Sequence, residues 1–377
     1  MVLTTLPLTS IALIFLISIG TSFMINLFLL KNKHFKINIS RIGQIRWATN
    51  PKPTLGGYSF FTIFLMLFVY IIFSQSLPNY LFISLTIAFA FGFLDDNFHT
   101  SPFTKIIGQL LVSTCFIVNN SIILVSDYQL FNSVFTIFWV VGMMNSINML
   151  DNMDGIVTSV SIIILGIALM IITQSGNINL TDVILIVGII GALMGFLFYN
   201  WNPAKIYMGD TGSQFLGAFL AWVSIQYFWS FRDSLEEGFQ VRQFLVPALA
   251  FIVPLIDTTT VTFRRLARRV SPFVGGSDHT THHLAYLGIS DKNVVRLMIG
   301  ISLSAVFVIY HIVNDLKDNQ WNFFKTLAVV IYYLTIFFVI QYFYEVAKRK
   351  INSTNIIEKE EVKNAERLNE ITTTQLS

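Results

Sequence analysis

Long runs of apolar residues recur along almost the whole of this 377-residue chain. A helix of about 20 such residues is long enough to cross the hydrocarbon core of a bilayer, which is roughly 30 Å thick. Only 12% of the residues are charged, whereas about 25% are charged in a typical soluble domain. Because the repeated runs and the low charge both disfavour a water-soluble fold, the sequence predicts an all-α integral membrane protein.

The runs predict a bundle of about 11 membrane-spanning helices. The expected spans are 11–30, 57–73, 81–94, 106–125, 131–147, 156–172, 183–198, 215–231, 244–261, 297–313 and 327–346. We expect the first run to be retained as a helix, because no Lys or Arg precedes it and no small-residue cleavage site follows it. An odd number of spans places the two chain ends on opposite sides of the membrane.

The positive charges predict the orientation of the bundle, because cytoplasmic loops carry an excess of Lys and Arg. With the N-terminus outside, 20 of the 24 Lys and Arg residues lie on the inner side, and the C-terminus is cytoplasmic. We expect a membrane domain over residues 1–350 and a polar tail, mobile or loosely helical, over residues 351–377. The net charge of +3 is too small to predict a nucleic-acid partner, and the single Cys115 excludes an intrachain disulfide.

Six acidic residues are expected at the cytoplasmic ends of the spans. They are Asp95, Asp96, Asp151, Asp154, Asp210 and Asp257. Ionisable groups at membrane depth are costly and tend to be functional. Carboxylates that converge on one interface repel each other unless a positive charge lies among them, and a divalent cation is the simplest such charge. The sequence therefore predicts a cation-binding site at the cytoplasmic face.

The motif NSINMLDNMDG ends the fifth expected span. Its polar residues Asn145, Asn148, Asp151 and Asp154 are spaced three apart, so they form a stripe along the end of that helix. The alternative is that they only cap the span and solvate a turn.

A second motif, FYNWNPAKIYMGDTGSQFLG, forms an inner loop that begins near Asn200. Asp210 lies between small residues at the start of the eighth span, where helix amides favour phosphate. As an alternative, Asp210 is an ordinary N-cap. Tyr207 is suited either to stack on a base or to anchor the loop at the membrane interface.

A basic loop, RRLARRVSPFVGGSDHTTHHL, follows the ninth expected span. Its arginines, Arg264 among them, suit anionic lipid headgroups. Three of the six histidines, His279, His282 and His283, gather in this loop, where imidazoles are suited to bind phosphate oxygens or to move protons. A zinc site is disfavoured, because no cysteine lies nearby.

Lys105 opens the fourth expected span, ten residues beyond Asp95. Its ammonium group is suited to pair with Asp95 or Asp96, or to hold a phosphate. The alternative is an ordinary lysine of the inner leaflet.

Six motifs occur in one order between Lys52 and His283 and resemble those of a known family. They are KPTLGG, FGFLDDNFHTSPFTKIIGQ, NSINMLDNMDG, YNWNPAKIYMGDTGS, PLIDTTTVTFRR and SPFVGGSDHTTHHL. In sequence and spacing they resemble the polyprenyl-phosphate N-acetylhexosamine-1-phosphate transferases of glycosyltransferase family 4. These enzymes transfer a sugar 1-phosphate from a UDP-sugar to undecaprenyl phosphate and release UMP. The resemblance implies ten or eleven helices in the bacterial cytoplasmic membrane, with the active site at the cytoplasmic face.

The resemblance also implies residue roles and partners. Asn148 and Asp210 would hold Mg²⁺, or Mn²⁺, against the nucleotide diphosphate, and Asp95 or Asp96 would serve the polyprenyl phosphate. The candidates for binding substrate are Lys105, Asp151, Asp154, Asn200, Tyr207, Arg264, His279, His282 and His283. The partners would be a UDP-N-acetylhexosamine, undecaprenyl phosphate and the bilayer, with a homodimer as one alternative for the oligomeric state.

Two subgroups of the family compete for this sequence. SPFVGGSDHTTHHL looks like the loop of the GlcNAc-1-phosphate transferases, whereas the phospho-MurNAc-pentapeptide translocases carry three adjacent histidines followed by Phe-Glu. One departure leaves the role of the first histidine open: His279 precedes the His282–His283 pair by three residues instead of two. The N-acetylhexosamine itself is also open, with GlcNAc as the default.

The expected chemistry is attack of a lipid phosphate oxygen on the β-phosphate of the UDP-sugar. Two adjacent carboxylates repel each other, which suits Asp95 or Asp96 to accept a proton. We expect a direct single displacement, and a two-step route through an aspartyl-phosphate is the alternative. A membrane carrier is the alternative from another class, although transporter acids usually lie near the bilayer midplane.

Overall fold

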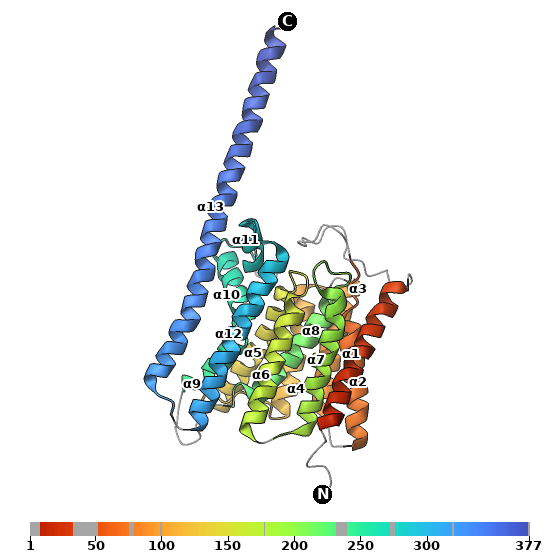
Figure 1. Ribbon diagram of the computed structural model, residues 1–377. Helices are drawn as coiled ribbons and strands as arrows, with labels where there is room; N and C mark the ends of the chain where they lie inside the picture. The colour runs from red at the N-terminus through yellow and green to blue at the C-terminus, as the bar shows by residue number, and fades with distance from the viewer. Residues whose placement is uncertain are drawn as a thin grey trace.

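The protein is a bundle of helices in a computed structural model (Figure 1). The structure describes residues 8–32, 52–74, 79–98, 100–176, 178–230, 240–271, 276, 278–318 and 320–375. Beyond residue 350 it describes the side chain of Ser353 alone. Within these ranges the regular structure is helical, apart from a single bridge residue, Pro53. Most of the predicted basic segment before Lys52, and the PFVG stretch of the histidine loop, lie outside the described residues.

The described residues form helices of very different lengths. They are α1 (Leu8–Lys31), α2 (Gly57–Ser74), α3 (Asn79–Phe98), α4 (Pro102–Val118), α5 (Gln129–Leu150), α6 (Ile156–Ser175), α7 (Leu180–Asn200), α8 (Gly209–Tyr227), α9 (Arg242–Ala250), α10 (Ile252–Ala267), α11 (Thr280–Tyr286), α12 (Asp291–Lys317) and α13 (Phe323–Gln375).

Each predicted span overlaps one of these helices, and the ninth overlaps the pair α9 and α10, which bends by 88°. Among the described residues, seven helices are long and apolar enough to cross a membrane: α1, α3, α5, α6, α7, α12 and the part of α13 up to Lys350. The bent pair would make an eighth span, and α2 and α4 are shorter apolar helices. The all-α, multi-pass membrane fold is confirmed, whereas the number of eleven spans stays a prediction.

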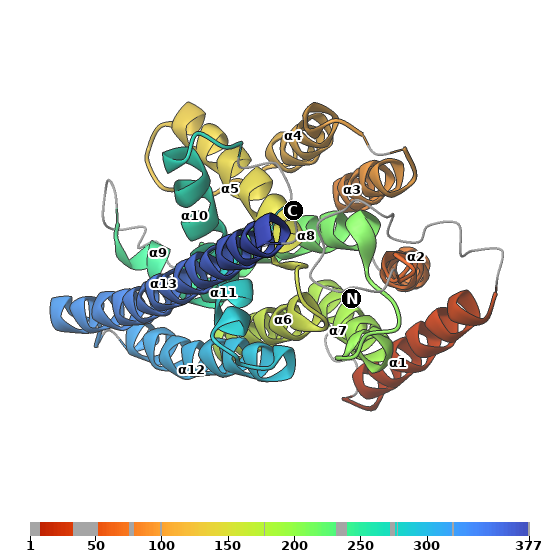
Figure 2. The same ribbon diagram turned by 90° about the horizontal axis from the view of Figure 1, so that it is seen from above.

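α8 lies inside the bundle, in contact with α2, α3, α5 and α6 (Figure 2). Nearly every residue of α8 from Thr211 to Ile225 is buried. A helix that contacts protein instead of lipid does not need a fully apolar surface, and small residues let its neighbours approach closely. This position explains why α8 carries polar and small residues yet lies at the centre of the fold.

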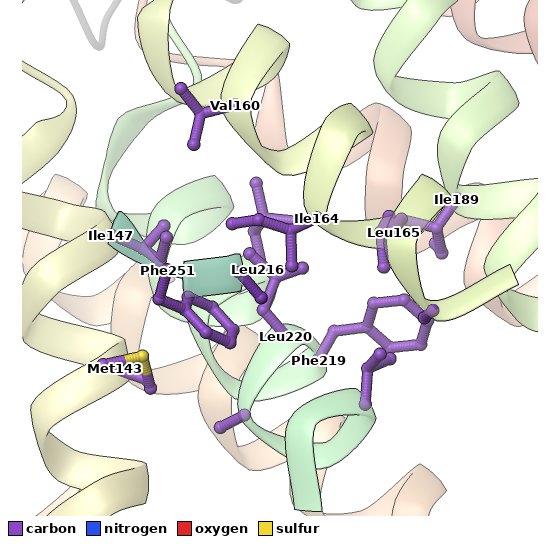
Figure 3. Close-up of a cluster of buried hydrophobic side chains, with 14 of the residues drawn as sticks. Met143, Ile147, Val160, Ile164, Leu165, Ile189, Leu216, Phe219, Leu220 and Phe251 are labelled. Atoms are coloured by element: carbon purple, nitrogen blue, oxygen red, sulfur yellow. The ribbon is translucent and has the colours of Figure 1, made fainter. Parts of the chain in front are cut away.

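The core between these helices is filled by branched and aromatic side chains (Figure 3). Met143 and Ile147 of α5 meet Leu216 and Leu220 of α8, and Phe251 projects among them from the bend between α9 and α10. In a bilayer, such interdigitated packing holds helices together, because lipid tails are as apolar as the side chains themselves.

Two glycines allow helices to touch the first turn of α8. A Cβ atom on Gly92 of α3 would lie 2.4 Å from the backbone oxygen of Asp210, and one on Gly57 of α2 would lie 2.3 Å from the Gly212 nitrogen. Any larger residue would push these helices away from α8. The backbone of α8's first turn is therefore held at a fixed place against α2 and α3.

The tail predicted for residues 351–377 begins as a direct continuation of α13. This helix runs from Phe323 to Gln375 and leaves the bundle at the end opposite the N-terminus (Figure 1). The predicted boundary at residue 350 therefore falls inside one helix.

Candidate active site

Lys105 lies between two carboxylates at one end of the bundle. Its Nζ atom is 2.9 Å from Asp95 Oδ2 and 2.9 Å from Asp210 Oδ2. The lysine sits in the first turn of α4, which begins at a fixed residue because the Ser101 hydroxyl accepts a hydrogen bond from Thr104 N. The last turn of α3 and the first turn of α8 supply the two aspartates. Three helices thus bring these charges to one point.

Asn148, in the last turn of α5, completes this group. Its Nδ2 atom donates to Asp210 Oδ1 and, at 2.8 Å, to Ser213 Oγ. We call Asp95, Lys105, Asn148 and Asp210 the carboxylate cluster. The side chains of Lys105 and Asp210 are 26% and 24% exposed, so molecules outside the bundle can reach the cluster.

A layer of side-chain amides lies one helical turn deeper in the bundle. Gln109 Nε2 donates to Asn145 Oδ1 and to Gln214 Oε1, both at 3.1 Å, and Asn145 returns a bond of 2.9 Å to Gln109 Oε1. Gln109 and Gln214 are buried. Because unpaired polar groups are costly in a buried site, these bonds favour one arrangement of α4, α5 and α8.

Asp96 makes different contacts from its neighbour Asp95. Its Oδ1 accepts from Asp210 N at 3.0 Å, and its Oδ2 accepts from Thr211 N at 2.8 Å and from Thr211 Oγ1 at 2.6 Å. Asp95 instead accepts from Thr100 Oγ1 at 2.6 Å and pairs with Lys105. One aspartate therefore binds the backbone of α8, and the other belongs to the carboxylate cluster.

The loop of residues 200–207 is tied together by buried bonds. Asn200 is 2% exposed. Its Nδ2 donates to Ile206 O at 3.0 Å, and its Oδ1 accepts from Thr158 Oγ1 at 2.8 Å. Tyr207 is 7% exposed, and Lys52 Nζ lies 5.2 Å from its ring centroid. The amide of Asn200 and the ring of Tyr207 are thus largely enclosed by the protein.

Asp154 is bound into the same loop. It accepts from Ala204 N at 2.8 Å and from Asn202 Nδ2 at 3.2 Å, and its carboxylate is 3.6 Å from Lys52 Nζ. Asp151 directly follows α5, and its backbone N–H donates to Asn148 O at 3.3 Å. Asp154 is therefore bound to the 200–207 loop, whereas Asp151 lies next to Asn148 of the carboxylate cluster.

Asp257 of α10 holds the start of the histidine helix α11. Its Oδ2 is 2.8 Å from His279 Nδ1, and its Oδ1 accepts from Thr280 N at 2.8 Å. Asp257 is 3% exposed and His279 5% exposed. A carboxylate on Nδ1 fixes the orientation of the ring and favours the Nδ1–H tautomer, which leaves Nε2 as the acceptor.

The other two histidines are buried in α11. Burial lowers the pKa of His282 and of His283 to about 4, and in both cases neighbouring positive groups contribute as well. The ring of His283 packs edge-on against Tyr344 of α13, with centroids 4.4 Å apart. Both imidazoles are therefore neutral at physiological pH.

The predicted arginine site lies where α10 meets α13. The guanidinium of Arg264 lies 3.2 Å from the ring centroid of Tyr344 and donates to Gln341 Oε1, and Arg268 donates to the Tyr344 hydroxyl at 2.8 Å. Burial would raise the pKa of Asp278, but its bonds to Arg265 of 2.6 and 3.0 Å outweigh that effect and lower it. These arginines hold α10, α13 and the histidine loop together.

The histidine helix is joined to the carboxylate cluster through the end of α5. Thr281 Oγ1 donates to Asn152 Oδ1 at 2.8 Å, four residues beyond Asn148. Ser146 accepts from Thr258 Oγ1 at 2.8 Å and donates to Pro254 O at 2.9 Å. α5 and the turn that follows it therefore connect the carboxylate cluster to α10 and to the histidine helix α11.

Of the six predicted carboxylates, the structure brings Asp95 and Asp210 together with Asn148 and Lys105 in one cluster. Asp96 instead binds the backbone of α8, Asp154 binds the 200–207 loop, and Asp257 belongs with the histidines in a second group. Which of these residues bind substrate stays a prediction. Sequence reasoning gave no role to Lys52 or Thr211, and it counted Asp257 only among the six acids of the expected cation-binding site, although all three contact predicted site residues. Lys52 and Asp257 do occur in the motifs KPTLGG and PLIDTTTVTFRR, which was the available signal.

Within the described residues, no three His, Cys, Asp or Glu side chains form a group able to hold a metal ion. The carboxylate cluster instead supplies oxygen atoms from two aspartates that both contact one ammonium group. Mg²⁺ is usually bound by one or two carboxylates together with substrate phosphates and water. The donor set of the cluster fits that pattern.

The fold and the site define a multi-pass membrane protein with a polar, carboxylate-containing site at one end of its helices. Residues 78–228 match the pattern of glycosyl transferase family 4. A phospho-N-acetylmuramoyl-pentapeptide-transferase of Staphylococcus saprophyticus is 31% identical over 303 residues, which cover 73% of this chain and 89% of that protein. The chain belongs to glycosyl transferase family 4.

Two further relatives show the range of names within the family. A probable undecaprenyl-phosphate N-acetylglucosaminyl 1-phosphate transferase of Bacillus subtilis is 28% identical over 287 residues, covering 71% of this chain and 77% of that protein. A phospho-N-acetylmuramoyl-pentapeptide-transferase of Staphylococcus carnosus is 31% identical over 223 residues, covering 52% of this chain and 69% of that protein.

Proposed function

We propose that the protein transfers an N-acetylhexosamine 1-phosphate, with GlcNAc as the first candidate, from a UDP-sugar to undecaprenyl phosphate and releases UMP. The observation that carries this proposal is the carboxylate cluster, in which Lys105 contacts both Asp95 and Asp210 beside the Asn148 amide. Phosphoryl transfer needs positive charge and fixed donors around the phosphates much more than it needs covalent chemistry. The cluster offers both at a place where a lipid and a soluble nucleotide could meet.

We place this site at the cytoplasmic face of the bacterial inner membrane, with eleven spans and the N-terminus outside. The charge bias of the loops supports this orientation.

Asp210 and Asn148, with Asp95 beside them, would hold Mg²⁺. Bound there, the ion would neutralise charge on the nucleotide diphosphate. Lys105 would bind a phosphate oxygen when substrate separates it from the aspartates. One of the paired aspartates Asp95 and Asp96 would accept a proton from the lipid phosphate. The oxygen of the lipid phosphate would then attack the β-phosphate of the UDP-sugar in a single displacement, and UMP would leave.

His279 would contribute from the second group of residues. Asp257 contacts its Nδ1 atom, so Nε2 is the atom suited to accept a hydrogen bond from the sugar. Two neutral imidazoles, those of His282 and His283, would position the histidine helix α11 and contribute less to the chemistry. Arg264, which contacts Tyr344 and Gln341, would do the same.

The transfer of phospho-MurNAc-pentapeptide is the second candidate, because two of the relatives at 31% identity carry that name. The histidine loop favours the GlcNAc-type reaction, since its three histidines are not adjacent. A membrane carrier is disfavoured by membership of a transferase family.

The test is UMP release by the purified protein in detergent, with undecaprenyl phosphate, UDP-GlcNAc and Mg²⁺. We expect release only when both substrates and the metal are present. Release with UDP-MurNAc-pentapeptide and not with UDP-GlcNAc would support the second candidate. No release with any UDP-N-acetylhexosamine would refute the proposed function.

A further inference from the structure

We propose that Asp96 is a positioning residue, which caps α8 from a neighbouring helix and thereby holds Asp210 in the carboxylate cluster. The inference deepens the proposed function and rests on it, since it divides the work of the two adjacent aspartates. Asp95 then remains as the member of the pair that faces the reacting groups.

The first turn of α8 lacks a cap of its own. The first amides of any helix have no partner within the helix, and Met208, the residue before α8, provides no side-chain hydrogen bond. Asp96 supplies what is missing: it accepts from the backbone nitrogens of Asp210 and Thr211 and from the Thr211 hydroxyl. A carboxylate also suits the positive end of the helix dipole.

The backbone around this cap is shaped for the carboxylate. Gly209 has a φ of +72°, which side chains rarely adopt, and a Cβ atom there would lie 2.6 Å from Asp96 Oδ2. Only glycine therefore lets the carboxylate approach the amides this closely. The segment before Gly209 is fixed as well, because Tyr207 N donates to Pro53 O at 2.8 Å and Gly57 N donates to Met208 O at 3.0 Å.

These contacts occupy most of what Asp96 can accept. A carboxylate has about four acceptor positions. Asp96 already accepts three hydrogen bonds, from Asp210 N, Thr211 N and the Thr211 hydroxyl. Asp95 has one hydroxyl donor, Thr100, and one ammonium partner, Lys105, which it shares with Asp210. The geometry therefore separates a carboxylate that organises α8 from one that belongs to the cluster.

The two roles predict different sizes of effect. Loss of a helix cap usually costs about 0.5–2 kcal/mol of stability. If all of that free energy is lost from the transition state, the rate of UMP release falls by between about 2-fold and about 30-fold, at about 1.36 kcal/mol per tenfold. Loss of a general base costs about 10²-fold to 10⁴-fold. Asp96→Asn retains an oxygen acceptor, so we expect it to stay within the smaller range and to be more active than Asp96→Ala.

The decisive experiment is a double-mutant cycle on the full-length protein in detergent. Asp96→Asn, Thr211→Val and the double variant are compared for UMP release with UDP-GlcNAc and for thermal unfolding. Because both changes damage the same cap, we expect the activity and the melting temperature of the double variant to be little lower than those of the worse single variant. The matched cycle pairs Thr211→Val with Asp95→Asn, and there we expect losses of melting temperature to add.

Equal losses above about 10³-fold for Asp96→Asn and Asp96→Ala would overturn the proposal, since they indicate a reacting group. Additive losses of melting temperature for Asp96→Asn and Thr211→Val would overturn it too. The melting temperatures need no turnover, so they test the cap even if the wild-type protein uses none of the UDP-sugars. If Asp96→Ala does not fold, Thr211→Val and Asp96→Asn still complete the cycle.

Discussion

The carboxylate cluster and the 200–207 loop are built from similar residues but differ in how far their polar side chains are exposed. In the cluster, the side chains of Asp210 and Lys105 are about a quarter exposed. In the loop, Asn200 and Tyr207 are almost fully buried, and both ends of the Asn200 amide are bonded within the protein. A polar residue in a motif can therefore serve either a ligand or the scaffold, and its partners decide which.

This difference predicts that changes in the cluster reduce activity more than stability, whereas changes in the loop do the reverse. The largest effect is expected for Asp210→Asn. It removes a charge that Lys105 and Asn148 both contact, and a metal-assisted transfer depends on several kcal/mol of charge stabilisation, or about 10³-fold in rate. UMP release should fall by that amount, while the melting temperature in detergent changes little.

Asn145→Ala provides the control for Asp210→Asn, because it disturbs the deeper amide layer without removing a charge. It should lower the melting temperature more than Asp210→Asn does. If Asp210→Asn lowers the melting temperature as much as Asn145→Ala does, the cluster mainly stabilises the fold, and the proposed difference from the 200–207 loop is wrong.

Lys105→Met is expected to have the next largest effect. Removing a single preorganised donor typically costs about 10²-fold to 10³-fold in turnover. The variant also leaves Asp95 and Asp210 without the ammonium that lies between them. Mg²⁺ should therefore raise the melting temperature of Lys105→Met more than that of the wild type. Lys105→Arg, which keeps the charge, is the matched variant and should not gain this extra stabilisation; an equal gain in all three proteins would contradict the idea that lysine and metal meet the same carboxylates.

Asn200→Ala tests the prediction for the 200–207 loop, that its residues matter for stability more than for activity. It leaves the Thr158 hydroxyl and the Ile206 carbonyl without the partner they have in the fold, and an unsatisfied buried group costs about 1–3 kcal/mol. We expect a clearly lower stability, measured by denaturant unfolding in detergent, with a KM for the UDP-sugar within a few-fold of wild type. Asn202→Ala, which loses only a bond of 3.2 Å to Asp154, should be milder. A large rise in KM without a loss of stability would show that Asn200 serves the nucleotide after all.

The helical membrane fold was predictable because apolar runs of sufficient length leave few other structures possible in a bilayer. α8 illustrates the limit of that argument: it was found as a run, yet its polar and small residues are explained only by the helices around it. The bend at Phe251 was missed for a similar reason, since the run 244–261 is continuous in sequence although it folds as two helices at 88°.

The candidate site was predictable as a list of residues but not as a set of partners. Spacing placed Asn148 and Asp154 on one stripe, but only the fold shows that one of them binds Asp210 and the other binds the backbone of Ala204. Asp95 and Asp96 are adjacent in the same helix and point at different groups. The contacts of Asn148, Asp154 and Asp96 join residues 62, 50 and 115 positions apart, which no local pattern encodes.

The smallest expected effect concerns pH and the buried histidines of α11. Burial lowers the pKa of His282 and His283 to about 4, whereas an unfolded histidine titrates near about 6.5. Between these values the unfolded chain binds more protons, so stability is complete above about pH 6.5 and is lost as the pH falls toward 4. Each histidine contributes at most about 1.4 kcal/mol per pH unit.

His283→Phe keeps the aromatic contact with Tyr344 but removes the titrating nitrogens. Its unfolding free energy should therefore fall less steeply than that of the wild type between pH 6.5 and pH 4, because carboxylates elsewhere contribute equally to both proteins. Equal slopes for the two proteins would mean that water reaches His283 in the folded state, and that α11 is more like the open carboxylate cluster than like the enclosed 200–207 loop.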